Sequence, residues 1–346
     1  MSGVNTYTGA TTVNAGVLQL TGKIYCSIVA CNVDQNPVGY IRVNSGGTLD
    51  VTDWSFYGSL GSNYFERDYI VIDGGTIRYS GLTSTSSGRA YTVTANGATF
   101  ENASSNTTWG FDYSAFATYN PTFSGPVRFT GVGNFAMSQI ISGAINLTKE
   151  GSGTLTLSKG NTYTGTTTIN GGTLKFDATG SIYASDITTN LYVNSGATLD
   201  VLTWGWYGNL GGLRFDPPNM VINGGTVRYS GVTGGDWRSF TVGNLGATFE
   251  SPTAGVTWNL NNSAQAPVIS GNLTFTGAGN MVMNHTLTGA NYSLIKNGAG
   301  TLTLGGNNTY TGATNINAGT LVVENNAPTF TTSGYSGAGT LVIQSA

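Results

Sequence analysis

The sequence predicts an all-β protein, a parallel β-solenoid in which residues 1–346 form one stack of about fourteen rungs, each rung being one turn of the chain. Two observations predict this fold. A short pattern of alternating apolar residues recurs along the chain, and turn residues separate its copies. Helix signals are poor, because Gly is abundant, with 52 copies, and β-branched residues are dense. With 18 Tyr, 14 Phe and 6 Trp the chain can bury a core, which excludes a disordered protein.

The recurring pattern is a small residue, usually Thr, an apolar residue, any residue and a second apolar residue. Its first residues are Gly16, Gly47, Gly75, Ala98, Gly125, Gly153, Gly172, Ala197, Gly225, Ala247, Gly271, Gly300, Gly319 and Gly339. Neighbouring copies lie about 20 to 30 residues apart, the period of a solenoid rung with extra residues in loops. The third position is always apolar, and the fifth is apolar except at Asn102 and Ser251. Both positions face one side of a strand, so stacked rungs are expected to form two apolar ladders.

The fourth position of the pattern lies between the two apolar ones and is expected to face solvent. Its charged members alternate in sign, as Asp50, Arg78, Glu101 and Arg128, and again as Lys175, Asp200, Arg228 and Glu250. Stacked strands lie about 4.8 Å apart, so like charges would repel and opposite charges attract. The alternation predicts that Arg78 lies between Asp50 and Glu101, and Arg228 between Asp200 and Glu250.

A longer repeat contains these rungs. The pentapeptide Asn-Thr-Tyr-Thr-Gly begins at Asn5, Asn161 and Asn308, and the text between these markers is similar. We therefore expect two long repeats, 5–160 and 161–307, and a partial third repeat, 308–346, within the single solenoid.

One stretch of the chain matches a known repeat. Residues 147–158 read Leu-Thr-Lys-Glu-Gly-Ser-Gly-Thr-Leu-Thr-Leu-Ser, and residues 161–174 read Asn-Thr-Tyr-Thr-Gly-Thr-Thr-Thr-Ile-Asn-Gly-Gly-Thr-Leu. A second such stretch runs from 294 to 321, and half matches lie at 5–20 and 337–343. These stretches, about a third of the chain, resemble the autotransporter-associated β-strand repeat. The resemblance implies a right-handed parallel β-helix from a secreted or surface-displayed bacterial passenger region. It also implies an extracellular or cell-surface location and a structural or adhesive role. The export route stays open.

Composition excludes several function classes. The net charge is only -3, which argues against a nucleic-acid partner. No apolar run of about 18 residues occurs, so no transmembrane segment is predicted. Two cysteines, Cys26 and Cys31, are too few for a cysteine metal site; they form either a disulfide-clipped loop or two unrelated thiols.

No catalytic residue, metal site or cofactor is predicted. Glycan-cleaving enzymes need convergent carboxylates, but no two acidic residues are adjacent, and the alternating row explains four of them. The only histidine, His285, has no counterpart in the other long repeat. This favours a structural role over the role of general base that activates a nucleophile. We therefore expect that the protein is not an enzyme, and a glycan-active enzyme is the weakest alternative.

Aromatic clusters recur at matching places in the two long repeats. They contain Trp54, Phe56 and Tyr57 in one repeat, and Trp204, Trp206 and Tyr207 in the other. These rings could stack on sugars or contact a partner. The alternative, which we favour, is that they brace a loop or cap the core.

The two ends of the sequence read as neighbouring parts of one repeat. The candidate polymer interface contains Asn5, Tyr7, Val322, Leu341, Val342 and Ile343. Neither end carries a polar cap, and the outward position turns apolar at Val322 and Val342. We expect head-to-tail assembly of the chain with itself into a filament or a surface stalk. The alternatives are that the chain is a fragment of a longer passenger, or a carbohydrate-binding adhesin whose partners are surface glycans.

Overall fold

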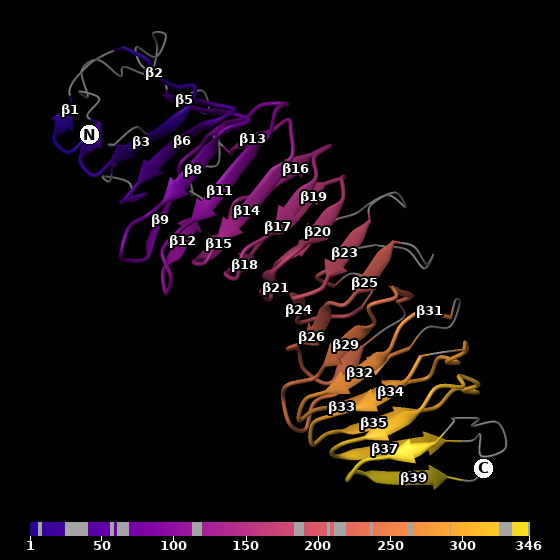
Figure 1. The fold of residues 1–346 in the computed structure, drawn as a ribbon. Coiled ribbons are helices and arrows are strands. Elements are labelled where there is room, and N and C mark those ends of the chain that lie inside the picture. The colour runs from indigo at the N-terminus through magenta and orange to yellow at the C-terminus, as the bar shows by residue number, and fades with distance from the viewer. Residues whose placement is uncertain are drawn as a thin grey trace. The chain divides into compact units, whose positions relative to one another are not determined.

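The computed structural model describes residues 1–5, 9–24, 41–55, 59–60, 69–112, 120–182, 190–205, 208–210, 219–235, 238–261, 266–290, 292–324 and 334–344. Over these residues the protein is all-β, and its strands build a parallel β-solenoid of about twelve turns, close to the expected fourteen. The predicted fold class is therefore confirmed. The chain divides into two compact units, Met1–Gly165 and Thr166–Ala346 (Figure 1). Cys26 and Cys31 lie outside the described residues.

The first unit has three main faces of parallel strands. One face contains, in spatial order, β2 (Thr11–Val13), β5 (Ile41–Asn44), β7 (Ile70–Asp73), β10 (Thr92–Val93) and β13 (Thr122–Phe123). The second contains β3 (Gly16–Leu20), β6 (Gly47–Val51), β8 (Thr76–Tyr79), β11 (Ala98–Asn102), β14 (Val127–Gly131) and β17 (Leu147–Lys149). The third contains β9 (Thr85–Ser87), β12 (Thr108–Phe111), β15 (Asn134–Met137) and β18 (Thr154–Leu157). Two short pairs complete the unit, β1 (Val4–Asn5) with β4 (Lys23–Ile24) and β16 (Ser142–Gly143) with β19 (Gly160–Tyr163).

The second unit repeats this arrangement. One face contains β20 (Thr167–Ile169), β23 (Leu191–Asn194), β25 (Met220–Asn223), β28 (Thr241–Val242) and β31 (Val268–Ile269). The next contains β21 (Gly172–Phe176), β24 (Ala197–Val201), β26 (Thr226–Tyr229), β29 (Ala247–Glu250), β32 (Leu273–Thr276), β34 (Leu294–Lys296), β36 (Thr314–Ile316) and β38 (Tyr335–Ser336). The third contains β27 (Gly234–Gly235), β30 (Thr257–Leu260), β33 (Asn280–Met283), β35 (Thr301–Leu304), β37 (Thr320–Glu324) and β39 (Thr340–Gln344). The short strand β22 (Ser181–Ile182) belongs to the same unit.

The apolar positions of the pattern form the core, as predicted. Seven third-position residues were expected inside, and all are completely buried: Leu49, Ile77, Phe100, Leu155, Leu199, Val227 and Phe249. Aromatic rings at successive rungs stack on one another, for example Phe100 on Phe129 with ring centres 5.3 Å apart. A glycine with positive φ makes the sharp turn between two faces, as at Gly46 (φ 86°) and Gly74 (φ 77°), where a side chain would be strained.

The two polar exceptions at the fifth position, Asn102 and Ser251, are also completely buried. Hydrogen bonds at a corner of the solenoid allow the polar side chain of Asn102 to be buried. Its amide nitrogen donates to the carbonyl of Asn134 at 2.8 Å, and its side-chain oxygen accepts from the hydroxyl of Thr107 at 3.2 Å. The side chain therefore joins a carbonyl of the next rung to a hydroxyl of its own turn, and its buried amide is satisfied.

The charged row has the predicted register at both predicted triplets. Arg78 is paired with Asp50 on one side and with Glu101 on the other. Arg228 is likewise paired with Asp200 and Glu250. The ion pairs form with the glutamates, at 3.7 Å for Arg78–Glu101 and 2.8 Å for Arg228–Glu250.

The expectation that every fourth-position residue faces solvent is wrong for Asp50 and Asp200. Asp50 is only 4% exposed and Asp200 only 5%. Both carboxylates are short and stand in a row whose neighbouring members, such as Lys175 and Arg228 beside Asp200, are long. A short group between long amphipathic side chains is readily screened from solvent. Burial accordingly raises the pKa of Asp200 above its ordinary value.

The expected position of Arg128 in this row is also wrong. Arg128 lies opposite Thr99, not Glu101, because Val127 pairs with Ala98 and begins the strand two residues further along the pattern. The segment before β14 contains Pro126, which cannot donate a ladder hydrogen bond. An even shift keeps Val127 and Phe129 facing inward, and both are buried. Arg128 pairs instead with Glu150.

The apolar ladder is not continuous along one face of the first unit. The copy of the pattern at 153–157 forms β18, in which Leu155 pairs with Phe135 of β15 on the third face. The preceding copies of the pattern, on β6, β8, β11 and β14, lie on the second face. The wrong expectation arose because apolar alternation specifies which side of a strand is buried but not which face of the solenoid carries it.

Candidate functional site

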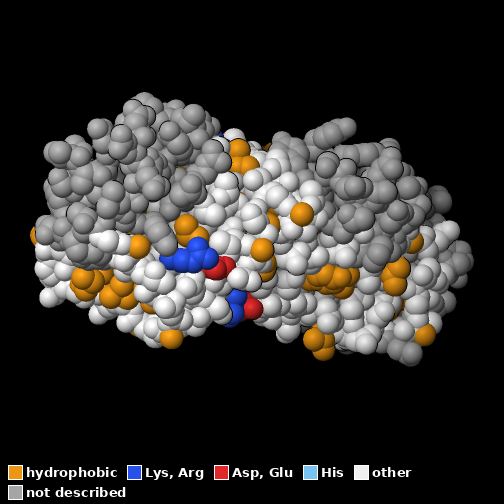
Figure 2. Space-filling model, turned by 90° about the horizontal axis from the view of Figure 1, so that it is seen from above, with side chains coloured by type: hydrophobic (Ala, Val, Ile, Leu, Met, Phe, Trp, Pro, Cys, Tyr) orange, Lys and Arg blue, Asp and Glu red, His pale blue; other side chains and the backbone are white. Residues whose placement is uncertain are grey.

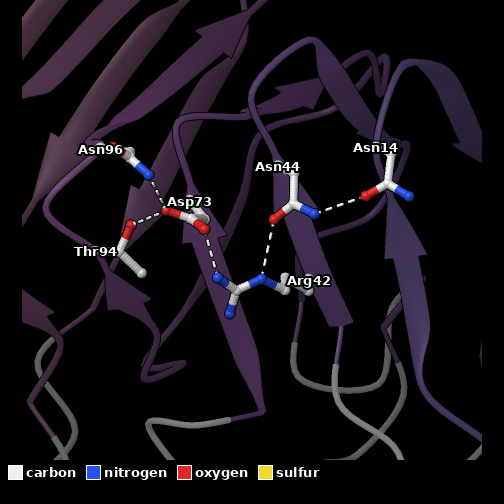
Figure 3. A network of polar contacts seen from close by, with 6 residues as sticks. All are labelled: Asn14, Arg42, Asn44, Asp73, Thr94 and Asn96. Atoms are coloured by element: carbon white, nitrogen blue, oxygen red, sulfur yellow. Dashed lines mark hydrogen bonds and ion pairs between the residues drawn. The ribbon is translucent and has the colours of Figure 1, made fainter.

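A polar network follows the edge of the first face of the first unit, where its strands turn into the second face. We call it the polar ladder, and it contains Asn14, Arg42, Asn44, Asp73, Thr94 and Asn96 (Figure 3). These residues come from β5, the end of β7 and the turns that follow β2 and β10, so they lie on four successive rungs.

Asp73 is the centre of the polar ladder. Its carboxylate accepts hydrogen bonds from the hydroxyl of Thr94, from the amide of Asn96 at 2.8 Å, and from the guanidinium of Arg42 (Figure 3). The bonds from Thr94 and Asn96, with that from Arg42, hold the pKa of Asp73 below its ordinary value of 3.8. Arg42 also donates from Nε to Asn44 at 2.9 Å. The carboxylate is ionised and fully engaged, so it is not suited to act as a general acid or base.

The second long repeat retains only the amide part of this network. Asn194 donates to Asn170 at 2.7 Å, as Asn44 donates to Asn14 at 2.7 Å. At the position of Asp73 stands Asn223, whose side-chain oxygen accepts the backbone N–H of Leu245 at 3.1 Å. The sequence puts Tyr192 in place of Arg42. The charged network is therefore special to the first repeat, and the amide ladder is common to both.

Asp73→Asn is expected to destabilise the first unit by about 1 kcal/mol at pH 7, because a partly exposed charge-assisted network is lost. The folded-state pKa of Asp73 is lowered, so its contribution is complete above pH 3.8 and disappears as the pH falls through the folded-state pKa. Urea unfolding of both proteins between pH 7 and pH 2 measures this difference. Asn223→Asp is the matched control: it puts the carboxylate into a site without Arg, and should not stabilise the protein.

The aromatic rings that the sequence offered as ligand contacts divide into two groups. Trp54 and Trp204 lie in the core, with residue exposures of 0% and 1%, so neither has a free face for a sugar ring. Each packs edge-on against a second tryptophan, Trp54 on Trp109 and Trp204 on Trp258, with ring centres 5.1 Å apart in both pairs. Phe56, Tyr57, Trp206 and Tyr207 lie outside the described residues.

Two buried arginines, which the sequence reasoning did not single out, accompany these tryptophans. Arg89 and Arg238 are each 5% exposed. Arg238 donates to the carbonyls of Trp204 at 2.8 Å and Gly205 at 2.9 Å. Burial lowers the pKa of Arg89 to about 10. Alignment of the two long repeats would have found them, because both contain an Arg at this place.

Buried lysines hold the turns of the matching repeat stretches. Lys149 and Lys296 are each 1% exposed. Lys149 donates to the carbonyls of Glu150 at 2.6 Å and Gly151 at 3.1 Å, and Lys296 does the same to Asn297 and Gly298 at 2.8 and 2.9 Å. Burial lowers the pKa of Lys149 to about 8. These lysines satisfy turn carbonyls from inside the solenoid, which is a structural role.

The candidate polymer residues occupy both ends of the described structure. Val322, on β37, and Leu341 and Val342, on β39, are half-buried, and Ile343 is 52% exposed. Asn5 is half-buried and donates to the carbonyls of Gly3 at 2.9 Å and Lys23 at 3.2 Å, and Tyr7 lies outside the described residues. The strand β39 pairs with β37 only and forms the edge of its sheet.

The described residues contain no group of three or more His, Cys, Asp and Glu side chains that could hold a metal ion. His285 is buried, and its Nε2 has no hydrogen-bond partner in the described structure. Four acidic groups instead form ion pairs with arginines, namely Asp73, Glu101, Glu150 and Glu250. Figure 2 shows one face of the molecule, where acidic and basic groups lie side by side on a mostly uncharged surface. In the described part of the chain no helix is long and apolar enough to cross a membrane.

Three stretches of the chain, 1–20, 147–176 and 294–323, match the passenger-associated-transport-repeat. The chain is also similar to the adhesin BmaC autotransporter of Brucella suis biovar 1 (strain 1330), with 28% identity over 320 residues. That match covers 90% of this chain and 7% of the relative. No solved structure matches the chain. The comparisons confirm the resemblance to an autotransporter passenger repeat and the extracellular or cell-surface location that it implies.

Proposed function

Because the chain carries passenger-type repeats of autotransporters, we propose that it is a structural, non-enzymatic solenoid that serves as a surface stalk or filament subunit by stacking on further rungs. The partner we propose is a second copy of the same chain, joined head to tail. One observation carries the proposal. Both units consist of stacked parallel rungs whose interior is apolar and whose outward charges are largely neutralised by one another. Such a stack of neighbouring rungs is an extended support.

The charge arrangement supports a non-enzymatic role. Glycan hydrolysis requires two carboxyl groups facing a common substrate, one of them free to move a proton. In this protein Glu101 pairs with Arg78, Glu250 with Arg228, and Asp73 is held by three donors. Each of these carboxylates is thus held by a neighbouring side chain of the solenoid instead of facing a shared substrate site.

The last described strand, β39, fits a further parallel rung, whether of the same chain or of a second copy. Its backbone groups that do not face β37 have no strand partner in the described structure, and Ile343 beside them is 52% exposed. An open strand edge with apolar side chains pairs readily with another strand. A further parallel rung would continue the ladder and bury Leu341 and Ile343.

Light scattering and negative-stain microscopy of the purified chain test the assembly. We expect a concentration-dependent increase in mass and unbranched filaments, because a heterologous contact that does not close makes an open polymer. Ile343→Lys should abolish them by placing a charge in the contact, whereas Val232→Lys, at a residue 78% exposed away from β39, should not. A wild-type chain that stays monomeric at every concentration contradicts the head-to-tail assembly but not the role as a stalk.

Glycan binding is the second proposal, and the similarity to an adhesin favours it. The residues that would contact the glycan are Phe56, Tyr57, Trp206 and Tyr207, since Trp54 and Trp204 are in the core. A glycan array comparing the wild type with the double variant Tyr57→Ala/Tyr207→Ala tests this proposal. Binding that the variant retains would argue against these rings as the contact.

A further inference from the structure

Hydrogen bonds join two nearby segments at the same place in each long repeat, and we call the described residues 53–55 with 59–60, and 203–205 with 208–210, the loop of that repeat. In the first repeat the backbone N–H of Ser59 donates to the carbonyl of Asp53 at 2.8 Å. In the second repeat the corresponding residues are Thr203 and Asn209. There the backbone N–H of Asn209 donates to the hydroxyl of Thr203 at 2.9 Å, and the Asn209 side chain accepts from the N–H of Thr203 at 2.8 Å. The two loops are thus closed at corresponding residues, Asp53 with Ser59 and Thr203 with Asn209, by hydrogen bonds to different acceptors.

A buried arginine of the next rung donates hydrogen bonds to the backbone of each loop. Arg89, in the connection between β9 and β10, donates from Nη2 to the carbonyl of Ser55 at 2.9 Å and from Nε to that of Trp54 at 3.4 Å. Arg238 makes the equivalent contacts with Gly205 and Trp204. The guanidinium of Arg89 also lies 5.9 Å from the ring centre of Trp54. A forked guanidinium suits two adjacent carbonyls in a way that lysine cannot reproduce.

The rung after that supplies the surface on which the loop tryptophan packs. Trp109, on β12, meets Trp54 edge-on with an interplanar angle of 76°, and Trp258, on β30, meets Trp204 at 79°. In the first repeat a fourth contact follows, because Gln139 donates to the carbonyl of Arg89 itself at 2.8 Å. Loop, arginine and second tryptophan therefore come from three successive rungs.

We propose that these contacts form a three-rung lock, once in each repeat, that makes three rungs open and close as one unit. The first lock contains Trp54, Arg89 and Trp109, and the second contains Trp204, Arg238 and Trp258. In a simple solenoid each rung contacts only its neighbours, and rungs can fray one at a time. Trp54 and Trp204 each contact a tryptophan two rungs further along the chain, so the rungs between them cannot fray one at a time. The loop becomes fixed only when the arginine-bearing rung and the tryptophan-bearing rung have both docked. The lock is independent of whether the chain forms filaments.

Hydrogen exchange of the full chain, read by mass spectrometry, tests the lock. Arg89→Met should raise exchange at least about tenfold throughout 47–60 and 76–112, because the whole unit opens, and leave 197–210 and 226–260 unchanged. Arg238→Met should do the reverse. Arg128→Gln is the matched control: this arginine of the first unit has a side chain 51% exposed and lies outside the lock, so exchange should change less than about twofold. Near-UV circular dichroism of the tryptophan pairs should fall with each lock variant and not with the control.

Two results would overturn the lock. One is an Arg89→Met effect restricted to the loop, with β8 and β12 still protected. The other is an equal effect on both repeats, which would mean one cooperative unit. Should the variants not fold, the wild type still decides: the amides of Ser55 and Ser59 must exchange within about threefold of that of Trp109. Exchange at the loop about a hundredfold faster would show that the loop opens alone.

Discussion

Trp204→Ala is expected to destabilise the second unit by about 3–5 kcal/mol, the cost of removing a large buried aromatic side chain and leaving a cavity. The ring is 1% exposed and packs against Trp258 with ring centres 5.1 Å apart. The midpoint of urea unfolding, followed by far-UV circular dichroism, measures the loss. Trp54→Ala should have a similar effect on the first unit, because its ring is also completely buried.

Two further variants separate a core role from a binding role. Trp204→Phe keeps a ring in the core and should cost distinctly less than Trp204→Ala. Val232→Ala, at a residue 78% exposed in the same unit, should change stability by less than about 0.5 kcal/mol. An unfolding midpoint that Trp204→Ala leaves in place, together with lost glycan binding, would assign the ring to ligand contact and contradict its place in the core.

The register of the stack could be predicted from the sequence because two independent patterns specify it. Apolar alternation placed Ile77 and Phe100 inside, and charge alternation placed Arg78 between Asp50 and Glu101, as found. A shift of one strand by one residue would have turned its apolar side chains outward. Skipping a rung would have brought like charges together. Neither pattern reports how far a side chain reaches, so the burial of Asp50 was missed.

The features that sequence reasoning missed depend on contacts between distant residues. Arg89 binds a carbonyl 35 residues earlier in the chain, and no local pattern marks that contact. The shift at Val127 depends on how the segment containing Pro126 crosses a corner, which the apolar pattern tolerates because the shift is even. The sequence left Trp54 either in the core or at a ligand, and the packing of its ring on Trp109 places it in the core. The side-chain contacts between rungs could therefore not be predicted from the sequence.

A loss of stability below pH 6.5 is expected at His285. This residue is 4% exposed, its Nε2 has no hydrogen-bond partner in the described structure, and burial lowers its pKa from 6.5 to about 4. Above pH 6.5 the imidazole is neutral in the folded and the unfolded chain. Between pH 6.5 and 4 the unfolded chain binds a proton that the folded chain does not, so stability must fall as the pH falls. The loss should reach about 2–3 kcal/mol at pH 4 and level off below it.

His285→Gln isolates this effect, because the first repeat carries Gln139 at the corresponding place, where it is buried and hydrogen-bonded. Wild type and variant share every carboxylate, so the difference between their unfolding free energies cancels the acid titration of Asp73 and the other acids. We expect that difference to be constant above pH 7 and to change by about 2–3 kcal/mol in favour of the variant between pH 7 and pH 4. Urea titrations at half-unit pH intervals give the curve. A difference that stays constant down to pH 4 would mean that the folded protein accepts the proton on His285, through solvent access or a partner that becomes available on protonation.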